Sequence, residues 1–217
     1  MRMAEDRVVI LGAGGHAKVV IELFRAQGRA IAGLIDLDPA PRSVLEVPVL
    51  GAAAALPGLV ASGLHHAFVA IGDNLARERV ARQAVELGLN LVNAISPAAN
   101  VSPTARLGQG VAIMAGAVVN ADAVIGDLAI INTAAVVDHD CHLERACHVG
   151  PGAALAGNVR LAHGVLVGVG ATVMPGCAIG AGAVVGAGAC VTADLPAGVV
   201  AAGVPARVLR PVAGGRP

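Results

Sequence analysis

Aromatic side chains are almost absent from this chain of 217 residues, which contains two phenylalanines and neither tryptophan nor tyrosine. A core built around aromatic anchors is therefore excluded, and the apolar side chains must pack as small aliphatic groups. Charged residues are also few, at 14% of the chain, and 15 basic residues balance 15 acidic ones. This balance argues against nucleic acid or an anionic membrane surface as a partner.

Cysteine pairs of the CxxC type are missing, so the four cysteines indicate neither a zinc centre nor a disulfide framework.

Residues 161–193 lack Asp, Glu, Lys and Arg and form a segment long enough to span a bilayer. They contain His163, Pro175 and regularly spaced glycines, however, which argues against a transmembrane helix. The charged N-terminus, residues 1–7, does not resemble a signal peptide. We therefore expect a cytoplasmic protein without a membrane-spanning segment.

Residues 1–94 alternate strand and helix patterns, which is typical of a parallel α/β sheet. Apolar runs at 8–11, 31–35 and 67–71 predict strands, and residues 47–50 predict a strand at the sheet edge because they include Pro48. Two helices are expected, one after the strand at 8–11 and one after the strand at 67–71. The apolar positions predicted to face the core are Ala17, Val20, Ile21 and Phe24 in the first helix and Ala76, Val80, Ala84 and Leu87 in the second, which Asp73 or Asn74 can cap.

A glycine-rich loop, Gly12-Ala13-Gly14-Gly15-His16-Ala17, follows the first strand and matches the dinucleotide-binding pattern with alanine in the last place. A complete dinucleotide fold needs two βαβαβ halves, and these residues supply one, so we expect a Rossmann-like half-fold that binds one nucleotide or nucleotide sugar. An NAD-dependent enzyme is the alternative. Loops at the carboxyl ends of the strands should bring together a substrate-binding set: Gly14, Gly15, His16, Asp36, Gly72 and Asp73.

From Ile95 onward a different rule holds, because every sixth residue is Ile, Leu or Val for seventeen successive positions, ending at Val191. A small residue follows most of them four places later. A six-residue period is typical of a parallel β-helix, in which the aliphatic side chain fills the axis and the small residue lets the backbone turn. We therefore expect residues 95–217 to form a hexapeptide β-helix with a C-terminal tail. Three cysteines, Cys141, Cys147 and Cys177, occupy the small inward position.

Polar residues that break the repeat gather between 132 and 158. His139 and Asp140 lie near a bend of the coil and point outward, with Ala121 and Gly157 one turn away from His139. A histidine beside a carboxylate, with space for a ligand, is typical of a general base. The sequence therefore predicts His139 and Asp140 as catalytic residues.

A smooth column of small residues, Pro151, Val169 and Ala187, runs along the predicted wall of the coil near His148. Such a column suits a long, thin cofactor. Four histidines in this half, His139, His142, His148 and His163, also raise the alternative of zinc held by three imidazoles, as in β-helices that resemble carbonic anhydrases. Their spacing does not bring three imidazoles to one wall, and we expect no metal.

Five segments carry a family resemblance: VVILGAGGHAKVV (8–20), AIGDN (70–74), INTAAVVDHDC (131–141), ALAGNV (154–159) and AGVPAR (202–207). With them the chain resembles bacterial nucleotide-sugar acyltransferases that join a Rossmann-like domain to a left-handed β-helix. This family includes relatives of sialic acid O-acetyltransferases, the UDP-amino-sugar N-acetyltransferases of bacillosamine synthesis and GDP-perosamine N-acetyltransferases. The resemblance implies a left-handed coil, acetyl-CoA as co-substrate, and a homotrimer with sites between neighbouring prisms.

The same resemblance implies an N-acetyltransferase that acts on a nucleotide-linked deoxyamino sugar for lipopolysaccharide or other surface glycans, and it favours GDP-perosamine over UDP-linked sugars. His139 is then the base and Asp140 its partner, although many relatives have Glu there. Acetyl-CoA contacts fall on His148, Val169 and Ala187. Nucleotide-sugar contacts fall on Gly14, Gly15, His16, Asp36 and Gly72, and Asn132 is expected to bind substrate. O-acetylation of a sialic acid or another sugar is one alternative, and a non-catalytic binding protein is another.

Overall fold

The computed structural model describes residues 7–38, 40 and 42–212. The chain forms two compact units, Met1–Pro97 and Ala98–Pro217. The predicted tail beyond Val212 and most of the charged N-terminus lie outside the described residues. Within the ranges that the structure describes, no helix is long and apolar enough to cross a membrane.

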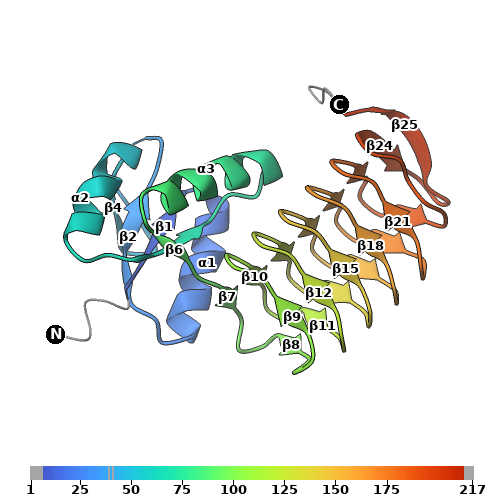
Figure 1. Cartoon of the computed structure of the whole chain (residues 1–217), viewed down its shortest axis with the longest axis horizontal. Helices are drawn as coiled ribbons and strands as arrows, with labels where there is room; N and C mark the ends of the chain where they lie inside the picture. The colour runs from blue at the N-terminus through green and yellow to red at the C-terminus, as the bar shows by residue number, and fades with distance from the viewer. Residues whose placement is uncertain (1–6, 39, 41, 213–217) are drawn as a thin grey trace. The chain divides into compact units, whose positions relative to one another are not determined.

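A six-stranded sheet forms the centre of the N-terminal unit, in the order β3-β4-β2-β1-β5-β6 (Figure 1). All neighbouring strands are parallel except β3 and β4. Strand β1, in the middle of the sheet, is buried along its whole length, which explains its unbroken apolar run. The strands are β1 (Val8–Leu11), β2 (Ile31–Ile35), β3 (Ser43–Val44), β4 (Val47–Gly51), β5 (His66–Val69) and β6 (Asn90–Leu91).

Three α-helices and one short 3-10 helix complete this unit: α1 (Gly15–Ala26), η1 (Ala53–Ala55), α2 (Leu56–Ala61) and α3 (Asn74–Glu86). All four predicted core residues of the first helix are buried in α1. Phe24 from this helix meets Phe68 from β5 edge to face, with ring centroids 5.6 Å apart. Asp73 caps α3 as predicted, since its carboxylate accepts the Ala76 N–H at 2.7 Å.

Two local predictions in this unit are wrong. β4 is not an edge strand, because the two-residue strand β3 pairs with it and places Ser43 opposite Pro48. The buried face of α3 is made by Arg77, Ala81 and Ala84 rather than by the whole predicted stripe. Leu87 is exposed.

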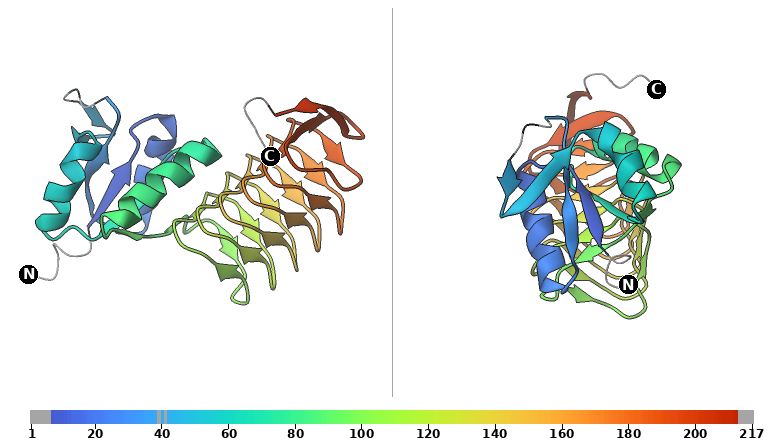
Figure 2. Two further views of the ribbon diagram at one scale, coloured as in Figure 1. Left: turned by 45° about the horizontal axis from the view of Figure 1, so that its top comes forward. Right: turned by 90° about the vertical axis from the view of Figure 1, so that its left-hand side faces the viewer.

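The C-terminal unit is a coil of two-residue strands stacked in parallel, seen in Figure 2 as successive turns from yellow-green to red. Each strand pairs with the equivalent strand one turn later, as Val136 does with Ala154. The repeat positions from Ile113 to Val191 are buried, as are Cys141, Cys147 and Cys177, which confirms the predicted inward positions. The first three, Ile95, Val101 and Leu107, are half-buried.

Three sheets form the faces of this prism. Strand β7 (Ala94–Ile95) ends the N-terminal unit. The first face of the prism contains β10 (Ala112–Ile113), β13 (Ile130–Ile131), β16 (His148–Val149), β19 (Leu166–Val167), β22 (Val184–Val185), β24 (Val199–Ala202) and β25 (Arg207–Pro211). The second contains β8 (Asn100–Val101), β11 (Val118–Val119), β14 (Val136–Val137), β17 (Ala154–Leu155), β20 (Thr172–Val173) and β23 (Cys190–Val191). The third contains β9 (Arg106–Leu107), β12 (Val124–Ile125), β15 (His142–Leu143), β18 (Arg160–Leu161) and β21 (Ala178–Ile179).

Bends between these faces carry the polar residues. We call the bend from the first face to the second the first corner, which includes residues 132–135, and the bend from the second face to the third the second corner, which includes residues 138–141. From Gly110 onward most bends contain one residue with a positive φ, which glycine, asparagine and aspartate tolerate best. At the second corner Asp140 takes this conformation at φ +59°. β25 is antiparallel to β24 and ends the coil.

Candidate functional site

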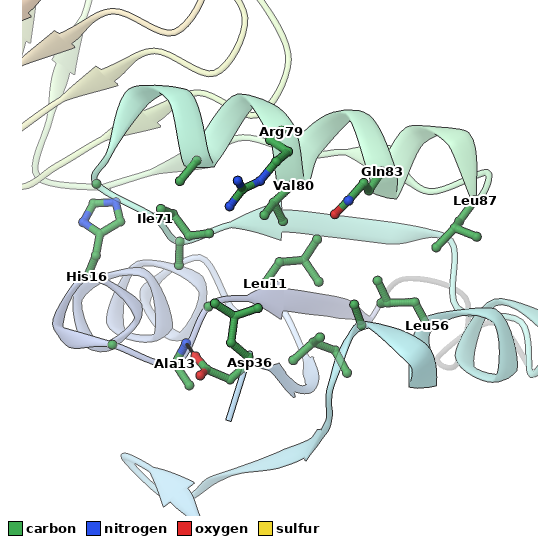
Figure 3. A pocket seen from close by; sticks show the side chains of 18 of the residues that line it. Leu11, Ala13, His16, Asp36, Leu56, Ile71, Arg79, Val80, Gln83 and Leu87 are labelled. Atoms are coloured by element: carbon green, nitrogen blue, oxygen red, sulfur yellow. Dashed lines mark hydrogen bonds between the residues drawn. The ribbon is translucent and has the colours of Figure 1, made fainter. Parts of the chain in front are cut away.

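A cavity of about 820 Å³ opens at the carboxyl ends of β1, β2 and β5 in the N-terminal unit (Figure 3). Five of the six residues predicted to bind substrate in this unit line it, namely Gly14, Gly15, His16, Asp36 and Gly72. Asp73 is not among the described residues that line it, because its carboxylate caps α3. The predicted convergence of the loops is therefore observed, with Asp73 as the exception.

Asp36 fastens the glycine loop to the end of β2. Its Oδ2 accepts the Ala13 N–H at 2.6 Å, its Oδ1 accepts the Asp38 N–H at 3.1 Å, and Arg42 forms an ion pair with it at 3.3 Å. Burial raises the pKa of Asp36, but the hydrogen bonds from Asp38 and Ala13 and the Arg42 guanidinium outweigh it, so this pKa lies below its usual value. Gly12 must lack a side chain here, because a Cβ would lie 2.9 Å from the Ala70 carbonyl oxygen.

His16 stands in the first turn of α1 and faces the cavity (Figure 3). Burial, together with the charge of Arg77, lowers the pKa of His16 to about 4, so the imidazole is neutral at pH 7. Its buried Nε2 has no hydrogen-bond partner among the described residues. Arg77 is itself buried and donates to the carbonyl oxygens of Ile71 and Gly72 at 3.1 and 3.0 Å. The cavity is thus lined by an uncharged imidazole, whose pKa the buried cation of Arg77 helps to lower.

Sequence reasoning missed the wall of this cavity that α3 provides. Ala76, Arg79, Val80, Gln83 and Leu87 line it, and Arg79 and Gln83 extend into it from the helix (Figure 3). Their spacing makes one helical stripe, and three of them are the apolar positions predicted as core. The stripe was a detectable signal, but hydrophobic periodicity does not separate a core face from a pocket face.

His139 and Asp140 stand together at the second corner of the prism. The His139 Nδ1 lies 2.8 Å from the Asp140 Oδ2, and both side chains are exposed. Asp138 supports the pair, since its Oδ1 accepts the His139 N–H and an Asn120 Nδ2–H, each at 2.8 Å. The ring lies against Gly157, where a Cβ would approach its Cε1 to 2.6 Å. The predicted pairing of His139 with Asp140 is observed, and the space at Gly157, predicted to admit a ligand, is taken by the His139 ring.

These neighbours decide what the His139 imidazole can do. The hydrogen bond to Asp140 and then the charge of Asp138 raise the pKa of His139 above its usual value. The Asp140 carboxylate can only accept, so Nδ1 carries the proton and Nε2 offers a lone pair. Asn120 and the His139 N–H lower the pKa of Asp138 and keep it ionised. The corner therefore holds an exposed base with two anionic neighbours.

His148 lies half-buried on the first face, between Ile130 and Leu166 on the adjoining strands. Its Nε2 is 3.0 Å from the Nδ2 of Asn132, which begins the first corner. Thr133, Pro151, Val169 and Ala187 follow one another along this corner, each linked to the next turn by a backbone hydrogen bond. The predicted cofactor column is thus a continuous strip, with Val169 57% exposed.

The structure does not bring His139 together with this strip in one chain. His139 stands at the second corner, whereas His148, Val169 and Ala187 belong to the first face and first corner, so the second face separates them. Among the residues that the structure describes, no three His, Cys, Asp or Glu side chains gather as metal ligands.

Comparison with known proteins relates this chain to acetyltransferases of known structure. The PglD N-terminal domain family matches residues 7–84. A perosamine N-acetyltransferase from Caulobacter crescentus, solved as a His-to-Asn mutant with CoA and GDP-perosamine, is 57% identical over 94% of this chain and 96% of that chain, with a TM-score of 0.92. The acetyltransferase domain of PglB from Neisseria gonorrhoeae, solved with acetyl coenzyme A, is 41% identical over 94% and 100% of the two chains, with a TM-score of 0.89. A search of curated proteins finds no match.

The chain belongs to the nucleotide-sugar acetyltransferase family. This finding confirms the predicted Rossmann-like half-fold, the left-handed β-helix and the enzyme class. The roles of individual residues in this acetyltransferase stay predictions. The geometry of the two units indicates which chemistry is available to them. One unit has a cavity with fixed polar groups, and the other has a base at one corner and a long apolar strip at the next.

Proposed function

We propose that this acetyltransferase transfers the acetyl group of acetyl-CoA to the amino group of GDP-perosamine. The observation that carries the proposal is the 57% identity, over nearly the whole chain, with an enzyme solved with CoA and GDP-perosamine. The exposed His139–Asp140 pair supplies the base that such a transfer needs.

In the proposed reaction the sugar amine attacks the carbonyl carbon of the thioester. A C–N bond forms and the C–S bond breaks, while the Nε2 of His139 takes a proton from the amine and the departing CoA sulfur is protonated. Asp140 keeps the other proton on Nδ1 and stabilises the imidazolium that forms. Much of the acceleration comes from holding the amine and thioester side by side. His139 supplies the base, so these steps require no metal ion.

The nucleotide part fits the cavity of the N-terminal unit. The N-terminus of α1 at Gly14 and Gly15 and the guanidinium of Arg79 suit the negative charge of a diphosphate. Gln83 and the neutral His16 offer uncharged hydrogen-bonding groups, and the apolar residues around them suit a base and a ribose. Asp36 acts by holding the glycine loop and remains able to accept from a ribose hydroxyl.

We further propose that the active enzyme is a homotrimer in the cytoplasm, where acetyl-CoA and nucleotide sugars are made, and that its product enters lipopolysaccharide or another surface glycan. The separation of His139 and the cofactor strip onto different corners supports a site shared between copies, because a second prism alongside can bring its strip to the first prism's base, and the number three is what the family resemblance implies. We expect His139→Asn and Val169→Arg chains to be inactive separately and partly active when co-assembled. A mixture without recovered activity would contradict a shared site.

Two measurements test the proposed substrate. Thiol release from acetyl-CoA should be fast with GDP-perosamine and slower with UDP-linked amino sugars, and calorimetry with GDP, UDP, dTDP and CMP should show selective binding of GDP. A cavity that binds none of the four, with acetylation of a free sialic acid instead, would overturn the proposal in favour of O-acetylation. Absence of thiol release across a panel of amino sugars would favour a non-catalytic binding role.

A further inference from the structure

Three polar side chains of α3 line the cavity of the N-terminal unit at helical spacing, namely Arg79, Gln83 and Glu86. Positions i, i+4 and i+7 lie on one side of a helix, so the three form a single stripe along the cavity. Within the described part of the chain, none of these side chains has a hydrogen bond or an ion pair with another residue. The stripe therefore offers a cation, an amide and a carboxylate, in that order, to a ligand.

The direction of α3 decides which end of the cavity each group serves. The helix starts at the end of the cavity where His16 lies and reaches Leu87 at the opposite end (Figure 3). Arg79 is therefore closer to the glycine loop than Glu86, and about 10 Å of helix separates the two. A nucleoside diphosphate carries its diphosphate and its base on opposite sides of the ribose. A diphosphate held at the glycine loop and Arg79 thus directs the base toward Glu86.

The end of the cavity near Leu87 suits a flat base. Leu56 lies at this end, and Pro57 follows it in α2, and both line the cavity with Leu87 (Figure 3). The two phenylalanines of the chain are buried against each other, so aliphatic side chains must cover the faces of the base. Such contacts do not distinguish one base from another, and discrimination falls to the polar groups at its edge.

A carboxylate distinguishes the bases because it can only accept hydrogen bonds. Guanine presents two adjacent donors, N1–H and the N2 amino group, which match the two oxygens of one carboxylate. Uracil and thymine present a single N–H between two carbonyl oxygens, and in cytosine and adenine the amino group stands beside a ring nitrogen that accepts. A carboxylate at the edge of the base therefore favours guanine and repels the acceptors of the others.

We propose that Glu86 is the specificity-determining residue of this cavity and accepts the N1–H and N2–H donors of a guanine base. Gln83, one turn earlier on the same stripe, can donate to the O6 atom on the same edge of guanine. The assignment rests on the proposed function, which puts a nucleoside diphosphate sugar in this cavity. Guanine is then selected by a carboxylate of α3, and the diphosphate by groups at the other end of the stripe.

Calorimetry with GDP and inosine diphosphate tests this role, because inosine diphosphate lacks only the N2 amino group. The wild type should bind inosine diphosphate about tenfold more weakly than GDP, which is the effect of one hydrogen bond to a charged group. In Glu86→Ala the affinity for GDP should fall by about tenfold to a hundredfold, and the two nucleotides should bind equally well. Binding of UDP should change little.

Glu22→Ala is the matched control, because Glu22 is also an exposed carboxylate on a helix, α1, and is not among the described residues that line the cavity. It should bind both nucleotides as the wild type does. A Glu86→Ala chain that still prefers GDP to inosine diphosphate would overturn the proposal. Equal weakening of GDP and UDP would assign Glu86 to the ribose or the diphosphate and also reject it, as would a wild type without measurable binding of GDP.

Acetyl transfer to GDP-perosamine is a separate measurement. If the wild type does not acetylate GDP-perosamine but its preference for GDP depends on Glu86, the proposed substrate is wrong and the role of Glu86 stands. If acetylation is fast and the KM for GDP-perosamine is the same in Glu86→Ala as in the wild type, the role of Glu86 is wrong and the proposed substrate stands.

Discussion

His139 and His148 both stand on the outside of one β-helix, less than one turn apart in sequence, and their neighbours contact opposite nitrogens of the two rings. Asp140 accepts from the Nδ1 of His139, which leaves the Nε2 lone pair to take a proton. The Asn132 amide donates to the Nε2 of His148, because its Oδ1 already accepts the Thr133 N–H. The residue at the bend therefore decides which ring nitrogen is engaged, Nδ1 in His139 and Nε2 in His148.

The surroundings of the two rings reinforce this difference. Asp140 and Asp138 favour a proton on His139, whereas Ile130 and Leu166, the neighbours of His148 along the sheet, carry no charge. His16 is a third case, because burial and the charge of Arg77 keep it neutral without a hydrogen bond to its Nε2 among the described residues. Substitutions at these positions separate the three situations.

The largest effect is expected for His139→Asn, which removes the base. Turnover should fall by about 10²- to 10⁴-fold, the usual range for loss of general-base catalysis, while the affinity for acetyl-CoA stays nearly the same. Steady-state kinetics and calorimetry with CoA measure the two quantities. His142→Asn, at an exposed position on the third face of the same turn, is the control and should be close to wild type. Near-normal turnover of His139→Asn would contradict the assignment.

Gly157→Ala should have the next largest effect, because the new methyl group would come within 2.6 Å of the His139 ring and displace it. A base moved from its productive position loses much of its effect, and we expect kcat to fall by about tenfold to a hundredfold. The temperature of unfolding checks that the coil stays folded. Unchanged kcat in a folded variant would mean that the ring position over Gly157 is not the active one.

Asp140→Asn should reduce kcat by about tenfold, less than loss of the base itself. Because the hydrogen bond to Asp140 raises the pKa of His139, removing the charge should lower that pKa. A base is active when deprotonated, so the acidic limb of the kcat/KM profile should move to lower pH. A limb that stays in place would show that it reports another group.

The smallest effect is expected for His16→Gln, and it concerns stability. The pKa of His16 is about 4 in the folded chain against an ordinary 6.5, so the unfolded chain takes up a proton that the folded chain cannot. The free energy of unfolding of the wild type therefore has its full value above pH 6.5 and decreases as the pH falls from 6.5 toward 4. In the variant the free energy of unfolding should not show this decrease, which amounts to up to about 3 kcal/mol in the wild type. Thermal unfolding measured across this pH range tests the difference. Exposed His142→Gln is the control, and identical slopes for His16→Gln and wild type would exclude the effect.

The coil could be predicted almost entirely from sequence, because the aliphatic side chain at each sixth position must fill the axis. The corner on which each polar residue lies could also have been found by counting. His139 and Val169 are separated by five hexapeptides, which is not a whole number of three-sided turns, so they cannot share a column. The N-terminal unit was harder, because the stripe on α3 fitted a core as well as a pocket and Arg77 is buried against the rule for charges.

The hydrogen-bonding state of the histidines was beyond sequence reasoning. That Asp140 follows His139 is visible in the sequence, but the 2.8 Å contact between them depends on the left-handed backbone at Asp140. The orientation of the Asn132 amide depends on the direction of the Thr133 N–H, which only the folded bend determines.

The hairpin of β24 and β25 limits how copies of the prism can associate. A stack of parallel strands that simply stopped would leave its last backbone groups ready to pair with another chain, which is a route to fibres. Here the final strand runs antiparallel to its neighbour, is exposed, and contains Arg207, Arg210 and Pro211, which discourage further pairing. These residues weaken pairing at the edge of β25 and so disfavour end-to-end growth through this strand.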